Sequence, residues 1–314
     1  MMQQRRIHKN QQAGIALIMV LLVVALVAIM AAGIASKQQL STRRTGNLLN
    51  NEQAYMYLLG AEDWAKNILA QDFKDNKTDS FDDDWAVELP PIPVEGGTIQ
   101  GKIKDLQARF NINNFLKAGN PDKDSIALFK NLLNENNIDI EVTDAIIDWL
   151  DENLDSTIPA GAEDGDYLNN AISYRAANRL MASASELIMV KGFDYKRYKK
   201  IAPYIIALPI FTPLNVNTAS AMQISMLSNQ ISLVEAKNII SERNKSGYKS
   251  VDEFIKQDAL KGKKITKIQL SVNSEYFLLQ ARSIIGSARS ELYSVLYRDK
   301  NGKIKVLLRT QRRI

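Results

Sequence analysis

An unbroken apolar run near the start of the chain most constrains what it can fold into. Residues 15–35 are all apolar or small and carry no charge. At 1.5 Å per helical residue, this run reaches about 31 Å, which matches the core of a bilayer. The residues before it include Arg5, Arg6 and Lys9 but no acid. The sequence therefore predicts one membrane-spanning helix whose N-terminus stays in the cytoplasm.

Three kinds of membrane signal remain open for this segment. A plain signal anchor would keep both leader and helix. A secretory signal would be cut after the run, near the small residues at 31–35, although the run is longer than the usual apolar region of such signals. A type IV pilin-like signal would be cut after Gly14, which makes Ile15 the first residue, and the basic leader ending in glycine resembles that class. Pilin-like proteins carry a glutamate five residues after the cut, where this chain has Met19.

Composition limits the chemistry of the remaining residues. They are enough for one large domain or two modest ones, and 46% hydrophobic with 24% charged residues indicates a globular chain. The chain has no cysteine, and its one histidine, His8, lies in the leader. This excludes disulfides, most catalytic triads and most zinc hydrolase sites. The net charge of +5 includes three leader cations, so it does not by itself indicate nucleic-acid binding.

The pattern of apolar residues predicts an α+β fold. Helical spacing continues through residues 36–72, so the membrane helix should extend beyond the bilayer. Alternation predicts strands at 98–106, 276–285 and 291–299, and the Asn301–Gly302 pair predicts a hairpin to the last strand. The pattern from about 110 to 270 predicts helices, with breaks at glycine, proline and asparagine residues. We therefore expect a long N-terminal helix packed on a small antiparallel sheet, with a large α-helical domain inserted in the sheet.

Carboxylates gather in the segment DWLDENLDSTIPAGAEDGDY at 148–167. Asp151, Asn153 and Asp155 alternate as in the start of a calcium loop, and Glu163 and Asp164 follow a turn. The glycine and last glutamate are not at EF-hand positions. Hard oxygen ligands without histidine or cysteine favour calcium over zinc or copper. The alternative is an exposed acidic loop in which Asp151 or Asp155 caps a turn.

Several stretches resemble one family in order along nearly the whole chain. They are LQARFNINN at 106–114, DWLDEN at 148–153, GAEDGDYL at 161–168, SYRAANRL at 173–180, SELIMVKGF at 185–193 and LNVNTAS at 214–220. The family is that of the minor pseudopilin general secretion pathway protein K, of type II secretion systems. Its members characteristically lack the helix glutamate, so Met19 agrees with the resemblance.

The resemblance implies a pseudopilin fold with five parts. These are a prepilin leader at 1–14, a transmembrane helix at 15–35, the pseudopilin helix and first strands at 36–109, an inserted α-helical domain at 110–272, and C-terminal strands at 273–314. It also implies a bacterial (Gram-negative) inner-membrane protein, single-pass, with its bulk in the periplasm. Prepilin peptidase would cut after Gly14 and methylate Ile15.

The resemblance further implies a role without enzymatic activity. Such a protein joins minor pseudopilins I and J at the tip of the pseudopilus, beside the other secretion-system pseudopilins, and aids its initiation and the export of folded proteins. Calcium binding is implied in the insertion, where this chain offers Asp151, Asn153, Asp155, Glu163 and Asp164.

A second hypothesis is an exported helix-hairpin-helix DNA-binding protein of a competence or type IV pilus system. Residues 214–255 resemble such a unit, but its turn at 228–232 lacks the glycine whose backbone would meet phosphate. Gly192 is followed by several cations at 196–200. We interpret both segments as structural and expect no nucleic-acid partner. A glycosidase is also disfavoured, because adjacent Glu163 and Asp164 do not give the two-carboxylate spacing.

Overall fold

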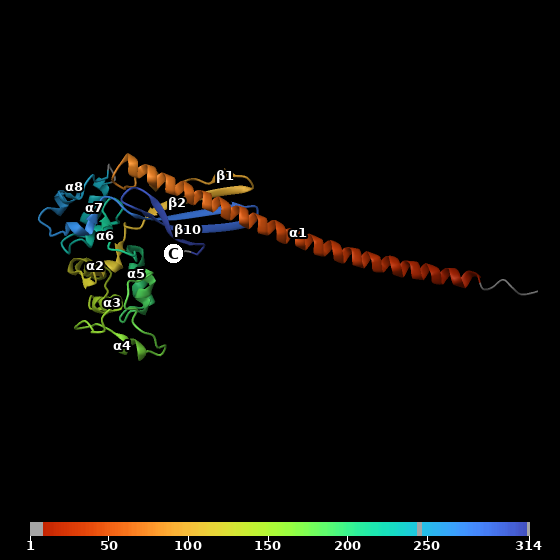
Figure 1. Cartoon of the computed structure of the whole chain (residues 1–314), viewed down its shortest axis with the longest axis horizontal. Coiled ribbons are helices and arrows are strands. Elements are labelled where there is room, and N and C mark those ends of the chain that lie inside the picture. Colours follow the sequence, from red (N-terminus) through yellow and green to blue (C-terminus); the bar gives the residue numbers. More distant parts are fainter. Residues whose placement is uncertain (1–8, 244–246, 313–314) are drawn as a thin grey trace, which may run out of the picture.

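One helix forms the stem of the molecule. The computed structural model describes residues 9–243 and 247–312, so most of the leader lies outside the described residues. Helix α1 (Lys9–Asp75) runs for 67 residues, which is about 100 Å at the usual helical rise. Its N-terminal half projects from the body, whereas its C-terminal half lies along the sheet (Figure 1). The predicted extension of the membrane helix through residue 72 is confirmed.

The C-terminal half of α1 packs on the sheet through one stripe of side chains. Ala54, Leu58, Ala65 and Leu69 are at most 2% exposed and recur at intervals of four or seven residues, so they share one helix face. Leu58 and Leu69 belong to a cluster with apolar side chains of the sheet. Burying a leucine stabilises a fold by about 1.5–3 kcal/mol. Glu62 lies in the same stripe and is also buried.

The sheet has five strands in the order β1-β2-β9-β10-β11, and each neighbouring pair is antiparallel. The strands are β1 (Ile92–Val94), β2 (Gly97–Asp105), β9 (Tyr276–Ile285), β10 (Ala288–Arg298) and β11 (Ile304–Thr310). The β10–β11 turn contains the predicted Asn301–Gly302 pair, and Gly302 has a positive φ of 79°. The predicted strands and the α+β fold are confirmed.

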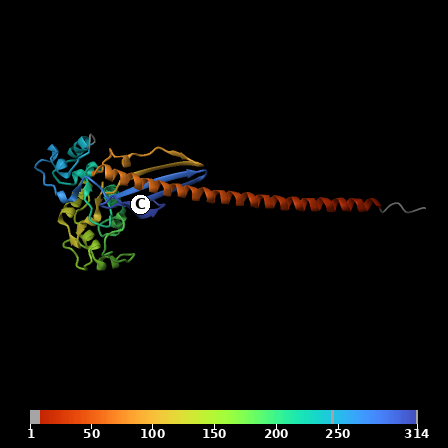
Figure 2. The same ribbon diagram turned by 45° about the horizontal axis from the view of Figure 1, so that its top comes forward.

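The inserted domain leaves the sheet at the end of β2 and returns at the start of β9. Asp105 on β2 is paired in register with Phe277 on β9, so the two connections lie side by side. The domain sits at the end of the molecule farthest from the start of α1 (Figures 1 and 2). Its helices are α2 (Lys123–Glu135), α3 (Val142–Leu150), α4 (Asp164–Leu168), α5 (Tyr195–Ile201), α6 (Ala221–Ser225), α7 (Leu233–Arg243) and α8 (Val251–Ile255).

Short pieces complete the structure. The 3-10 helices are η1 (Asp84–Ala86), η2 (Ile112–Phe115), η3 (Ala184–Met189), η4 (Ala202–Tyr204), η5 (Asp258–Leu260) and η6 (Lys267–Gln269). Two-residue strands pair as β3 (Phe110–Asn111) with β6 (Ile205–Ile206), β4 (Leu116–Lys117) with β5 (Asn120–Pro121), and β7 (Leu214–Asn215) with β8 (Leu270–Ser271). The predicted helical pattern with breaks is confirmed, whereas the two-residue strand pairs were not predicted.

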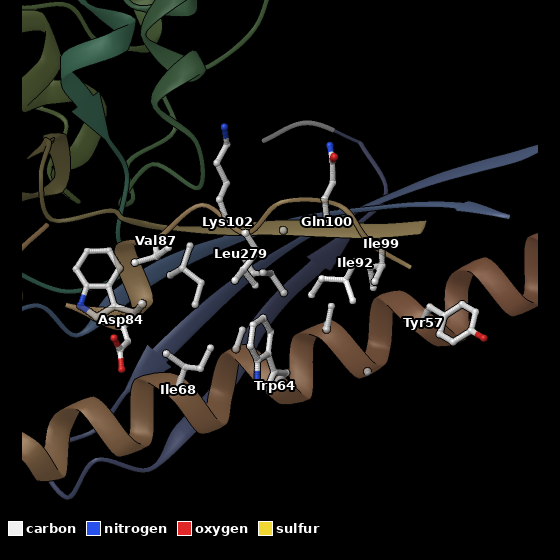
Figure 3. Close-up of a pocket in the computed structure, with 17 residues that line it drawn as sticks. Tyr57, Trp64, Ile68, Asp84, Val87, Ile92, Ile99, Gln100, Lys102 and Leu279 are labelled. Atoms are coloured by element: carbon white, nitrogen blue, oxygen red, sulfur yellow. The ribbon is translucent and has the colours of Figure 1, made fainter. Parts of the chain in front are cut away.

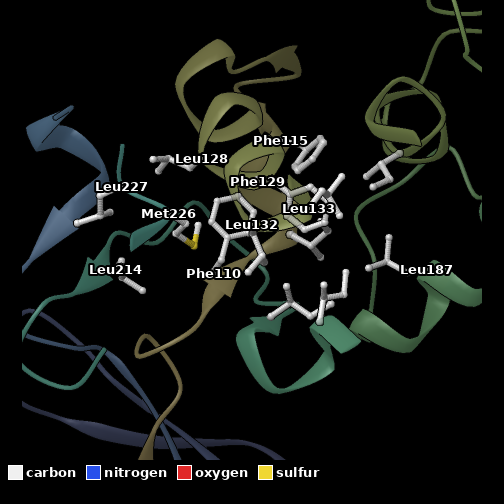
Figure 4. Close-up of a cluster of buried hydrophobic side chains, with 14 of the residues drawn as sticks. Phe110, Phe115, Leu128, Phe129, Leu132, Leu133, Leu187, Leu214, Met226 and Leu227 are labelled. Atoms are coloured by element: carbon white, nitrogen blue, oxygen red, sulfur yellow. The ribbon is translucent and has the colours of Figure 1, made fainter. Parts of the chain in front are cut away.

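The inserted domain has its own apolar core. Phe110, Phe115 and Phe129 contact one another with ring centroids 5.1–6.3 Å apart. Leucines of α2 surround them, and Met226 and Leu227 approach from the segment after α6 (Figure 4). This core is separate from the cluster between α1 and the sheet. The insertion therefore satisfies the usual requirement for a domain, a hydrophobic core of its own.

Buried asparagine side chains hydrogen-bond backbone groups in parts of the insertion that lack regular secondary structure. Asn111 and Asn113 are at most 2% exposed. The Asn111 amide donates to Ile210 O (2.8 Å), and its Oδ1 accepts from Leu208 N (2.9 Å). Asn113 donates to Met181 O at 2.9 Å. Side-chain amides thus satisfy backbone groups far away in sequence, as a buried loop requires.

Candidate metal centre and docking groove

Two carboxylates of the predicted calcium loop come together where the chain leaves α3 and approaches α4. Asp151 follows the last residue of α3, and Glu163 directly precedes α4. Between them the chain passes through a largely exposed loop, then returns to the core at Ala162. Asp151 is 6% exposed and Glu163 is 7% exposed. Both acids therefore lie at the edge of the domain core instead of in solvent.

Asp148 is a third carboxylate near Asp151 and Glu163, and it fixes the loop between them through backbone hydrogen bonds. Its Oδ1 accepts a hydrogen bond from Thr157 N at 3.0 Å, and its Oδ2 accepts one from Ala162 N at 2.7 Å. A Cβ on Gly161 would lie 2.2 Å from Asp148 Oδ2, so only glycine fits there without movement. Asp148 precedes Asp151 by three residues, which places both on one side of the last helical turn. That spacing was the sequence signal by which Asp148 could have been found.

Three carboxylate oxygens of Asp151 and Glu163 are buried without a hydrogen bond. Neither oxygen of the Glu163 carboxylate accepts a hydrogen bond, nor does Asp151 Oδ1. Burial, with repulsion from Asp148 and Asp151, raises the pKa of Glu163 to about 7. Burial and the Asp148 charge likewise raise the pKa of Asp151. Unpaired buried oxygens and mutual repulsion are what a bound cation would relieve.

The other predicted ligands have different neighbours. Asn153 Oδ1 accepts from Asp155 N at 2.7 Å, and both residues are exposed. The Asp155 charge acts on Asp151 but ranks below other causes of its pKa shift. Asp164 accepts from Ala176 N and lies 3.4 Å from the Arg175 guanidinium. The structure thus brings Asp151 and Glu163 together with Asp148 and keeps Asp155 nearby. Asn153 hydrogen-bonds Asp151, and Asp164 lies beside Glu163, although its carboxylate also contacts Ala176 N and Arg175.

A second candidate site is an apolar groove along α1. It has a volume of about 550 Å³ and runs between α1, the segment after η1, and strands β1 and β2 (Figure 3). Trp64 on α1 is 44% exposed, and Val87 and Ile92 on the facing wall are 56% and 40% exposed. Gly60 and Ala61 line the α1 side. Exposed apolar surface concentrated in one hollow is typical of a binding surface.

The projecting part of α1 is long and apolar enough to cross a membrane. Its most apolar 18-residue window has a mean hydropathy of 3.2 and no buried residue. Ile15 and Met19 are about 60% exposed there. Gly14 lies in the helix, and a Cβ at this position would meet no atom within 4 Å beyond its chain neighbours and the nearby helix backbone. The predicted cut between Gly14 and Ile15 stays a prediction.

Known proteins resemble this chain over nearly its whole length. Residues 108–210 and 214–273 match two family models, both described as type II secretion system (T2SS), protein K. The type II secretion system protein K of Pseudomonas aeruginosa is 36% identical over 96% of this chain and 93% of its own length. The type II secretion system protein K of Aeromonas hydrophila is 33% identical over 96% of this chain and 97% of its own length.

A solved structure shows the same fold. It is a chain in the crystal structure of the GspK-GspI-GspJ complex from the enterotoxigenic Escherichia coli type 2 secretion system. The superposition has a TM-score of 0.74 at 25% sequence identity, and covers 86% of this chain and all of the other. The likeness therefore includes more than the inserted domain.

Proposed function

This chain belongs to the type II secretion system protein K family, and from that membership we propose that it is a minor pseudopilin at the tip of the pseudopilus. We place it with minor pseudopilins I and J, because the similar solved chain was crystallised in a GspK-GspI-GspJ complex. Its role is structural: it aids initiation of the pseudopilus and export of folded proteins. We propose no catalytic step.

The position of the inserted domain carries the tip assignment. The domain is larger than the sheet and projects at the end of the molecule distal to the anchor (Figure 1). A repeating shaft packs many stems closely, so a wide appendage on each subunit would crowd it. At the tip, the space beyond the domain is free. An epitope inserted at the exposed residues 169–172 should label one end of isolated pseudopili, and label along the shaft contradicts the proposal.

Met19 supports the same placement. In other pseudopilins, a glutamate here is thought to pair with the N-terminal amine of a neighbouring subunit, and an unpaired charge in an apolar bundle is costly. A subunit with Met19 cannot offer this pairing, so it fits where no further subunit requires it. Met19→Glu should disturb the tip complex. If the variant is distributed along the shaft with secretion intact, the tip proposal is wrong.

We propose that α1 anchors the protein in the inner membrane with its N-terminus in the cytoplasm. The basic leader and the exposed apolar half of α1 support this orientation. Prepilin peptidase would cut after Gly14 and methylate Ile15. Mass spectrometry of the N-terminus of protein recovered from membranes tests this directly. We expect N-methylated Ile15, whereas a start at Met1 or near residue 36 would overturn the proposal.

The groove along α1 is the surface that we assign to the stem helix of a neighbouring minor pseudopilin. Stems anchored in the same membrane run side by side, and the groove follows the flank of α1 above the membrane span. Half-exposed Trp64 supplies a large aromatic anchor, the residue type that carries most binding energy at interfaces. The small residues Gly60 and Ala61 leave room for a helix to approach.

We propose that the insertion binds calcium through Asp151 and Glu163, with Asp155 from the loop. The ligand chemistry fits, because the buried oxygens of Asp151 and Glu163 that have no partner are carboxylate oxygens, and the chain has no cysteine. When bound, the ion would neutralise the repulsion among these acids and fix the loop to the domain core. At a calcium concentration 100 times Kd, the folded chain would gain about 2.7 kcal/mol.

Titration calorimetry on the full chain in detergent tests the calcium site. Glu163→Gln and Asp151→Asn should each weaken binding at least tenfold. Glu152→Gln is the matched control, since Glu152 is an exposed acid of the same loop. The absence of any calcium-dependent heat or thermal shift in the unmodified chain would refute the site.

A further inference from the structure

Three acids face one another just after the end of the stem helix. Asp72 belongs to the last turn of α1, and Asp79 and Asp83 lie in the loop that leads to η1. One carboxylate oxygen from each lies within 4.8 Å of the others. The loop is held in shape locally, because Asp83 Oδ2 accepts from Ser80 N at 2.6 Å and Asn76 N donates to Asp72 O at 2.9 Å.

Two of these acids are buried beside Arg298, and Asp83 is half-buried. Asp79 is fully buried, and Asp72 is 8% exposed. Arg298, at the end of β10, pairs with both of them through its two terminal nitrogens, and Nη1 lies 3.2 Å from Asp72 Oδ2. Lys77 turns away, since its ammonium bonds Phe73 O and lies over the Phe73 ring. Three carboxylates against one guanidinium leave two negative charges among these groups.

One oxygen of the group has no partner. Asp79 Oδ2 accepts from Ser274 N at 2.7 Å and from Arg298, but Asp79 Oδ1 is buried without any hydrogen bond. Burial, together with repulsion from Asp83 and Asp79, raises the pKa of Asp72 to about 7. Burial also raises the pKa of Asp79. A buried acceptor without a hydrogen bond destabilises the folded state, and a ligand bound at this oxygen would remove that cost.

We propose that Asp72, Asp79 and Asp83 bind a divalent cation of the calcium type. A charge of +2 would match the excess of two carboxylates and supply the missing partner of Asp79. All protein donors are hard oxygens, which select calcium over zinc or copper. This site lies outside the insertion and is separate from the one at Asp151 and Glu163. It does not depend on the tip assignment.

The ion would sit at the joint between stem, sheet and inserted domain. Asp79 N donates to Val272 O at 2.8 Å, and Asp79 O accepts from the Asn215 amide at 3.0 Å. Asp79 therefore contacts the chain segment that returns from the insertion as well as a buried residue inside it. A cation that bridges Asp79 to Asp72 would join those contacts to the end of α1. Calcium would thus fix how the inserted domain is held on the stem.

Trp85 makes the site detectable. Its indole Nε1 lies 3.3 Å from Asp83 Oδ2, so a Tb³⁺ ion bound there would receive energy from the excited indole. We would titrate the full chain in detergent with Tb³⁺ and follow its sensitised emission, then displace it with Ca²⁺. Emission should saturate, and Ca²⁺ should reverse it. Trp85→Phe should remove this signal, whereas Trp149→Phe, which affects the insertion, should preserve it.

Carboxylate variants assign the ligands. Asp83→Asn should weaken Tb³⁺ binding at least tenfold and keeps the Arg298 pairs, so it avoids the folding risk of Asp79→Asn. Asp82→Asn is the matched control, because Asp82 is the exposed neighbour. Glu163→Gln should leave the Trp85-sensitised emission unchanged. Absence of emission, or emission that persists in Trp85→Phe and Asp83→Asn, would overturn the proposal, whatever the protein does in secretion.

Discussion

Glu62 on α1 and Arg309 on β11 form an ion pair, with 2.6 Å between Oε1 and Nη2. The glutamate is 2% exposed and also bonds the Ser294 hydroxyl on β10. Burial raises the pKa of Glu62, but the Arg309 and Ser294 hydrogen bonds outweigh it, so that its pKa is lowered overall. This ion pair joins the edge strand β11 to the stem, and it does so at Glu62, a buried position within the apolar stripe of α1.

Removing Glu62 should loosen the stem. Glu62→Ala leaves a buried gap and an arginine without its partner, and we expect a loss of about 2–3 kcal/mol in the free energy of unfolding. Asp63→Ala is the control, because Asp63 forms an exposed pair with Lys66 and should cost less than about 0.5 kcal/mol. Urea unfolding of the full chain in detergent measures both. Equal losses would show that the buried pair has no special weight.

Asp105 should make stability depend on pH. Burial raises its pKa to about 6, although bonds from Thr218 and Ser274 act against the rise. In the unfolded chain its pKa is near 3.8, so between these values the folded chain holds a proton that the unfolded chain has released. The stability due to this group therefore falls as pH rises from about 4 to about 7, by about 2 kcal/mol.

The variant Asp105→Asn isolates this effect. The asparagine side chain does not titrate in this range. The unfolding free energy of the parent minus that of the variant should therefore fall as the pH rises from about 4 to about 7. Parallel pH profiles would contradict the assigned pKa.

Gly161 should be essential for the loop of the proposed calcium site. A Cβ there would meet Asp148 Oδ2 at 2.2 Å and the Thr157 backbone at 2.5 Å. We expect Gly161→Ala to cost about 1–3 kcal/mol and to weaken calcium binding to the insertion. Gly165→Ala is the control, because no atom lies within 4 Å of a Cβ at that position. Thermal unfolding with and without calcium compares them, and equal behaviour of the two variants would contradict the packing argument.

The groove along α1 can be tested by assembly. Trp64→Glu places a charge in the apolar hollow, so co-purification with minor pseudopilins I and J should fall at least tenfold while the fold is kept. Val234→Glu is a control of greater exposure, on α7 of the insertion. If Trp64→Glu assembles as the parent does, the partner stem lies on another surface.

The sequence predicted the sheet and stem well because both depend on local periodicity. The alternation at 276–285 and the Asn301–Gly302 turn are confirmed as β9 and the β10–β11 hairpin. The insertion was harder, because Asn111 and Asn113 bond backbone groups almost 70 to 100 residues away. No local pattern encodes such contacts.

The carboxylate sites show the same limit. The alternation in the loop indicated Asp151, and the acids after the turn indicated Glu163. Asp148 lies in α3, three residues before Asp151, but no local pattern encodes its hydrogen bonds to Thr157 N and Ala162 N. Asp79 and Arg298 are 219 residues apart, so their contact could not be read from either segment.

The register of β2 with β9 has a consequence for how such a chain can change. Because Asp105 pairs with Phe277, the intervening residues begin and end one strand spacing apart. A tight turn could span that gap, and excision of the whole insertion would leave an ordinary β-hairpin in a continuous sheet. In topological terms, the insertion is the loop of the β2–β9 hairpin, and this loop is large enough to have a hydrophobic core of its own. It could be enlarged at its outer face without redesign of the stem, whereas an exchanged insertion would have to keep the Asn215 and Val272 contacts to Asp79.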